Sequence, residues 1–155
     1  MIPQDVQKYV KNVVANAQAT AAGVAVVLTA GATEDGVKVT GQTIDRLKFR
    51  SVALAVDVLA TLGASETIAF AVEYQDSSDG STWNTAVAMQ ASTVLLTDSG
   101  SGSNLHGTLE LSLDLTARQR YIRFNITPDM SASGTDTAVW TANATLGGAQ
   151  DSAVA

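Results

Sequence analysis

The stretch that decides the fold runs from Phe70 to Trp83 and reads Phe-Ala-Val-Glu-Tyr-Gln-Asp-Ser-Ser-Asp-Gly-Ser-Thr-Trp. Its first half alternates Phe70, Val72 and Tyr74 with smaller or polar residues, which is the two-residue period of a half-buried strand. Asp79-Gly80 then favours a turn, because glycine adopts a positive φ without steric cost. The stretch therefore predicts a β-hairpin in which Trp83 belongs to the returning strand.

Segments with strand character follow one another from Val24 onward. They are 24–29, 37–40, 47–62, 67–75, 82–90, 93–96, 108–116, 121–127 and 137–146, with Gly, Ser, Asp and Asn clusters between them. The clearest alternation places leucine at 109, 111, 113 and 115 and polar residues between, so one face should enter the core. Asp57 interrupts an apolar run and is expected to face solvent or a neighbouring subunit. We predict an all-β fold, an antiparallel β-sandwich or jelly roll over residues 24–147, with a flexible tail at 148–155.

Residues 1–23 are predicted to form an N-terminal arm or a short helix. Val6, Val10 and Val13 recur at helical spacing, with Tyr9 beside Val10. The charge-free stretch that follows is interrupted by polar residues, which argues against a signal peptide or a membrane span. We therefore expect a protein made in the cytoplasm, without a membrane partner.

The net charge and the cysteine content limit the classes of function that the protein can have. The 155 residues carry a formal net charge of −6 and no cysteine, which excludes disulfides and thiolate metal sites and disfavours nucleic-acid binding. No Lys or Arg occurs between Ser51 and Ala117. Cations recur at strand spacing in two strips: Arg46, Lys48 and Arg50, and Arg118, Arg120 and Arg123. If the two strands are neighbours, the strips form one positive patch for an acidic protein partner; otherwise they are solvated charges on an exposed face.

Catalytic and metal-binding patterns are sparse. His106 is the only histidine, and its place beside a Gly/Ser loop favours a surface residue over a catalytic one. Asp76 and Asp79 offer oxygen ligands and form a weak Ca²⁺ candidate, although turn formation explains both residues more simply. The sequence predicts a protein that is not an enzyme and needs no cofactor.

Two segments together resemble a family of carbohydrate-binding sandwiches. Tyr74 to Trp83, followed by Arg120-Tyr-Ile-Arg-Phe124, resembles the S-x-D-G-x-x-W and A-R-Y-I-R elements of discoidin-like (coagulation factor 5/8 C-type) domains. This resemblance implies a β-sandwich that binds sugars, with Trp83, Trp140 and Arg123 as the possible ligand contacts. Sugar binding is therefore the alternative function.

The whole chain resembles the head decoration (cement) proteins of tailed bacteriophages. The shared features are a charge-poor Ala/Thr/Ser/Val/Gly texture, the lack of cysteine, a short N-terminal arm and one β domain of this length. This resemblance implies a virion protein that binds the major capsid protein on the outer capsid surface as a homo-oligomer, expected to be a trimer, and stabilises the head. The contacts that we expect are Val6, Tyr9, Val10 and Val13 first, and Arg46, Lys48 and Arg50 second. A phage tail or baseplate component is a further alternative.

Overall fold

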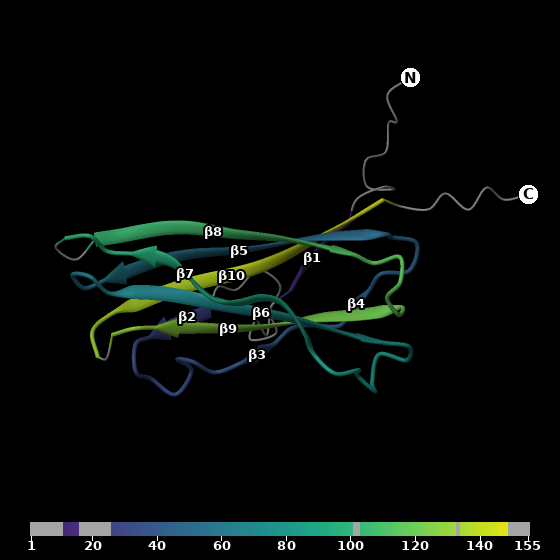
Figure 1. Ribbon diagram of the computed structural model, residues 1–155, viewed down its shortest axis with the longest axis horizontal. Helices are drawn as coiled ribbons and strands as arrows, with labels where there is room; N and C mark the ends of the chain where they lie inside the picture. The colour runs from purple at the N-terminus through teal and green to yellow at the C-terminus, as the bar shows by residue number, and fades with distance from the viewer. Residues whose placement is uncertain (1–10, 16–25, 101–102, 133, 149–155) are drawn as a thin grey trace, which may run out of the picture.

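The computed structural model describes residues 11–15, 26–100, 103–132 and 134–148, and these form two antiparallel sheets without a helix (Figure 1). One sheet, here sheet A, contains β1 (Lys11–Val14), β2 (Val26–Thr29), β5 (Ser51–Leu62), β8 (Ser103–Asp114) and β10 (Thr137–Gly147). The other, sheet B, contains β3 (Val39–Thr40), β4 (Ile44–Asp45), β6 (Thr67–Ser77), β7 (Val87–Thr97) and β9 (Tyr121–Met130).

The strand order is that of a jelly roll. In sheet A, β10 lies between β5 and the short strands β1 and β2, and β8 forms the other edge. In sheet B, β9 lies between β6 and the short strands β3 and β4, and β7 forms the other edge. From β7 onward each connection crosses from one sheet to the other. The predicted all-β sandwich is therefore confirmed.

The predicted hairpin is formed by β6 and β7, but its loop is longer than expected. The two strands pair antiparallel from Thr67 opposite Thr97 to Tyr74 opposite Val87, and residues 78–86 connect them. The prediction that Trp83 lies in the returning strand is wrong, because the loop first closes on its own polar side chains. The Asp79 carboxylate accepts hydrogen bonds from the backbone N–H groups of Ser81 and Thr82, both at 2.8 Å.

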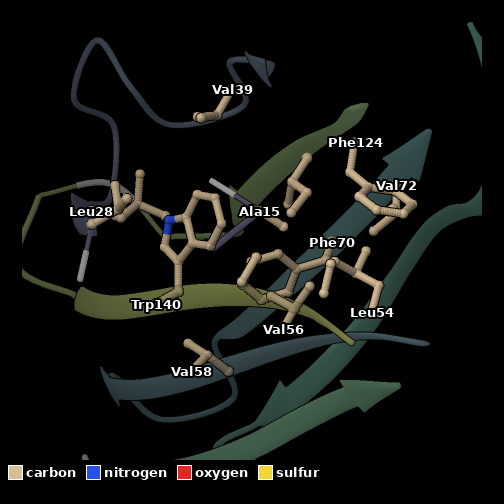
Figure 2. Close-up of a cluster of buried hydrophobic side chains, with 14 of the residues drawn as sticks. Ala15, Leu28, Val39, Leu54, Val56, Val58, Phe70, Val72, Phe124 and Trp140 are labelled. Atoms are coloured by element: carbon tan, nitrogen blue, oxygen red, sulfur yellow. The ribbon is translucent and has the colours of Figure 1, made fainter. Parts of the chain in front are cut away.

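The core lies between the sheets and is built from alternate residues of the long central strands. Every second residue of β5 from Val52 to Leu62 is buried, and so are the inward residues of β10. Trp140 at its centre is fully buried and meets Phe70 edge to face, with ring centroids 6.0 Å apart (Figure 2). The predicted alternation of β8 is present, since Glu110, Ser112 and Asp114 point outward.

The N-terminal segment enters sheet A as a strand. Lys11–Val14 pairs with Leu146–Asn143 of β10, so the helix predicted from the valine spacing is wrong at its C-terminal end. The physical reason is that Val13-Val14 is β-branched and the edge of β10 is open beside it. Val13 packs against the core. Val6, Tyr9 and Val10 lie outside the described residues. The division of the chain into 1–23, 24–147 and 148–155 stays a prediction.

Candidate interaction surfaces

The residues predicted as a basic strip, Arg46, Lys48 and Arg50, lie in the connection between β4 and β5. Their predicted strand conformation is wrong, because the chain turns here: Lys48 has a φ of 78°, and the Phe49 N–H donates to the Arg46 carbonyl at 2.8 Å. Lys48 and Arg50 are exposed, and so is Leu47, at 53%. The turn therefore presents two cations and one apolar side chain to solvent.

The second basic segment lies beside this turn, which is one of the two arrangements that the sequence left open, and the two segments meet through loops. Arg46 Nε donates to the Gln119 carbonyl at 2.9 Å, and Arg46 Nη2 donates to the Arg118 carbonyl. Arg120 forms a salt bridge with Asp45 at 2.7 Å. Arg46 and Arg120 thus tie the β8–β9 loop to the end of the sandwich. We call this end, with Arg46, Lys48, Arg50, Arg118 and Arg120, the basic end (Figure 1, right).

Acidic residues gather at the opposite end of the sandwich. They lie in the β2–β3, β5–β6 and β7–β8 connections and beside the β9–β10 turn: Glu34, Asp35, Glu66, Asp98, Asp129 and Asp136. Some of them hold the loops together. Asp136 accepts a hydrogen bond from the Gly63 N–H at 2.8 Å, and Asp35 accepts one from the Met130 N–H at 2.8 Å. The basic end also holds the carboxylates of Asp45, Asp76, Asp79 and Asp114, so the larger excess of one charge is the negative charge at the acidic end.

The three predicted sugar contacts are not together. Arg123 places its guanidinium carbon 4.2 Å from the centre of the Trp83 ring, and its Nε donates to Gln75 Oε1 at 3.0 Å. Gln75 in turn donates to the Asn84 carbonyl at 2.8 Å. This stack fastens the β6–β7 loop to sheet B, and partial burial lowers the pKa of Arg123. Trp140 is fully buried in the core, so it cannot contact a ligand at the surface.

The outer face of sheet A has an exposed apolar ladder near the acidic end. Val27, Val139 and Leu59 are neighbours across β2, β10 and β5, and they are 66%, 38% and 54% exposed. His106 of β8 is next in this row and is exposed. Asp57 points outward as predicted, and its carboxylate accepts a hydrogen bond from the Thr108 hydroxyl at 2.7 Å. Such a ladder on an uncovered sheet is a feature of contact surfaces.

The edge strands β7 and β8 are less buried than the strands that they flank. Among their described side chains none is buried, whereas β5, β6, β9 and β10 bury alternate residues almost completely. The inward leucines of β8 pack against the core but keep part of their surface accessible. Sequence reasoning missed this edge, because the alternation of β8 is identical to that of a strand covered by neighbours on both sides.

The sequence candidates for catalysis and metal binding are His106, Asp76 and Asp79. The imidazole of His106 sits on an exposed strand face, and within the described ranges no three His, Cys, Asp or Glu side chains gather closely enough to hold a metal ion. In the loop proposed for Ca²⁺, Asp76 accepts hydrogen bonds from Asn84 Nδ2 at 2.7 Å and from the Gln119 N–H at 3.1 Å. These bonds give Asp76 a structural role. The part of the chain that the structure describes contains no helix with the length and apolar character needed to cross a bilayer.

Asp79 makes the stability of the loop depend on pH. The N–H groups of Thr82 and Ser81, and then the Ser77 hydroxyl, hold the pKa of the Asp79 carboxyl well below its usual range. A carboxyl with a depressed pKa stabilises the fold above its unfolded pKa, and this contribution is lost as the pH falls through the folded value. We expect urea denaturation to show a steeper loss of stability below about pH 4 for the wild type than for Asp79→Asn. Equal slopes would contradict this role.

Comparison with solved structures gives a consistent picture of the fold. The structure of the infectious bursal disease virus Gx strain matches with a TM-score of 0.52 and 12% identity, over 92% of this chain and 33% of that chain. The T13 particle of the same virus matches with a TM-score of 0.51 and 14% identity, over 88% and 30%. The protein has a fold found in virus particles.

The extent of this similarity is limited. The chain spans about a third of the length of these viral chains, and the low identity makes the similarity one of fold. No family model matches the sequence, and no curated protein matches it either. A fold shared at this level does not determine a function, which depends on the residues at the surface.

Proposed function

We propose that the protein is a structural component of a virus particle: a decoration protein that binds the outer surface of a phage head and stabilises the shell. The observation that carries this proposal is the jelly roll that aligns, over 92% of the chain, with a domain-sized part of an icosahedral virus protein. The phage and the outer surface come from the resemblance of the sequence to head decoration proteins.

The proposed partner is the major capsid protein, and the proposed oligomer is a trimer. A shell of repeated subunits offers identical three-fold positions, and a trimer that sits on such a position uses every copy in the same way. Contacts between neighbouring subunits then resist shell expansion and opening. Light scattering in solution tests the copy number: a trimer is expected, and a stable monomer at micromolar concentration would contradict it.

The proposed contacts are the N-terminal residues and the basic end. Val6, Tyr9 and Val10 remain candidates, whereas Val13 packs against the core and has less surface to offer. The turn presents an exposed patch that consists of Leu47, Lys48 and Arg50. This patch fits an acidic partner surface. Arg46 is a positioning residue, because its guanidinium holds the neighbouring loop.

A sedimentation assay tests these contacts. Purified shells that lack the protein are mixed with wild-type protein, and the bound fraction is measured after pelleting. Deletion of residues 2–10, which leaves β1 intact, should reduce occupancy at least about tenfold if the arm supplies an apolar anchor. Unchanged occupancy would remove the arm from the contact surface.

A single charge tests the basic end in the same assay. Lys48→Ser is expected to weaken shell binding about threefold, because one exposed charge contributes about 1 kcal/mol or less. Lys38→Ser is the matched control, since it removes the same charge from the outer face of sheet B, where Lys38 pairs with Glu73. Equal effects of the two variants would show that only net charge matters.

A further inference from the structure

β8 forms an edge of sheet A at which a further strand can pair. β8 pairs with β5 through twelve consecutive residues, from Ser103 opposite Leu62 to Asp114 opposite Ser51, without a bulge. No described strand pairs with its other side. By contrast, β7 at the edge of sheet B has three register shifts against β6, and bulges of this kind hinder further pairing.

The sequence of β8 lacks the proline, lysine and bulges that most often block an edge strand, and its charged side chains are the acidic Glu110 and Asp114. It reads Ser-Asn-Leu-His-Gly-Thr-Leu-Glu-Leu-Ser-Leu-Asp, without proline, lysine or arginine. β7 contacts β8 at Gly107, where a Cβ atom would lie 2.8 Å from Leu96 Cδ2. Leu109, Leu111 and Leu113 beyond this point face inward but stay partly exposed. Apolar side chains of an added strand would cover them.

A hollow of about 420 Å³ opens beside the same half of β8. Small side chains line most of it, and Glu110 is its only charged lining residue; Leu111 and Ser112 complete the β8 side. Asp114 and Asp57 lie on the same outer face, and among the five strands of sheet A only β1 contains a Lys or Arg, at Lys11. A lysine or arginine side chain from a neighbouring strand would therefore find space and an unopposed carboxylate here.

We propose that β8, over Leu109–Asp114, binds an extended segment of the shell subunit as an additional strand of sheet A. The segment has apolar residues at alternate positions and at least one Lys or Arg that reaches Glu110. Main-chain hydrogen bonds supply affinity, and the hollow selects the basic residue. This inference rests on the proposed function, because it names the element that receives the shell subunit.

A second copy of this chain fits the edge less well. Each copy carries a formal net charge of −6, and β8 offers only Glu110, Asp114 and His106 as groups that can carry charge. Arg118 lies near Asp114 at one end of this edge, but two such edges would still bring their Glu110 carboxylates together, whereas a basic segment neutralises them.

Hydrogen exchange on shell-bound protein tests the proposal directly. The amide hydrogens of β8 that point away from β5 should exchange at least about tenfold more slowly on the shell than in free protein, because they gain acceptors. Amides of β10 from Thr137 to Trp140, where β10 pairs with β2 on one side and β5 on the other, serve as the internal control. Glu110→Lys should weaken shell binding about tenfold, and Glu34→Lys, the same charge change at the acidic end, should not.

The outcomes separate this inference from the proposed function. Shell binding with unchanged exchange in β8 overturns the inference and leaves the proposed function standing. Protection of β8 that appears in free protein as its concentration rises identifies a second copy as the occupant and overturns the basic segment. No binding of wild-type protein to the shell overturns the proposed function and this inference with it.

Discussion

Trp140→Ala is expected to lower the free energy of unfolding by about 4 kcal/mol, which is a large part of the stability of a domain of this size. The indole is fully buried between the sheets and packs edge to face on Phe70 (Figure 2). Its removal leaves a cavity that β strands fixed by hydrogen bonds on both sides cannot close. Chemical denaturation followed by circular dichroism measures the change.

Trp140→Phe is the control that separates volume from polarity. The indole N–H of Trp140 is buried without a hydrogen-bond acceptor in the structure, so phenylalanine removes an unsatisfied donor together with part of the ring. We expect a loss of less than about 2 kcal/mol. A loss as large as that of Trp140→Ala would show that the N–H does have a partner.

Gly41→Ala is expected to destabilise the protein by about 3 kcal/mol, near the upper end for overpacking. A Cβ atom at Gly41 would lie 2.1 Å from the Ala15 carbonyl oxygen and 2.4 Å from the Phe124 carbonyl oxygen. Both obstacles are backbone, and both are held: Gly41 donates its N–H to Phe124 at 2.7 Å, and the Ala15 N–H donates to Ala142 at 2.8 Å. Ala15, which follows β1, would have to move away from Gly41.

Gly100→Ala is the matched control for this steric argument. A Cβ atom at Gly100 meets nothing within 4 Å, so its effect should stay within about 0.5 kcal/mol. If thermal unfolding shows the same loss for both variants, close packing at Gly41 is not the cause.

The sandwich could be predicted from the sequence wherever burial of one strand face makes apolar and polar residues alternate. The alternation in β6 and β8 predicted a sandwich, because a strand packed on one face must alternate. The same reasoning failed at Arg46, Lys48 and Arg50, whose spacing resembles a strand although Lys48 adopts a left-handed turn. It also failed at Val13, because three valines at helical spacing cannot show that the edge of β10 is open.

The interaction surfaces were less accessible to sequence reasoning. The nearness of the two basic segments could be anticipated as a possibility, but its cause is long-range: Arg46 bonds backbone carbonyls more than seventy residues away. β8 is an open edge because β7 pairs with β6 in sheet B and not with β8. No local sequence pattern indicates this arrangement. Trp140 and Trp83 look alike in sequence, yet one is at the centre of the core and the other is in a surface loop.

The most direct test of the central claim is an electron cryo-microscopy map of the virus particle that contains this protein. We expect density for the jelly roll on the outer surface of the head at symmetry-related positions, and the loss of this density from particles made without the protein. Density in the tail or baseplate, or a head surface unchanged by removal of the protein, would contradict it.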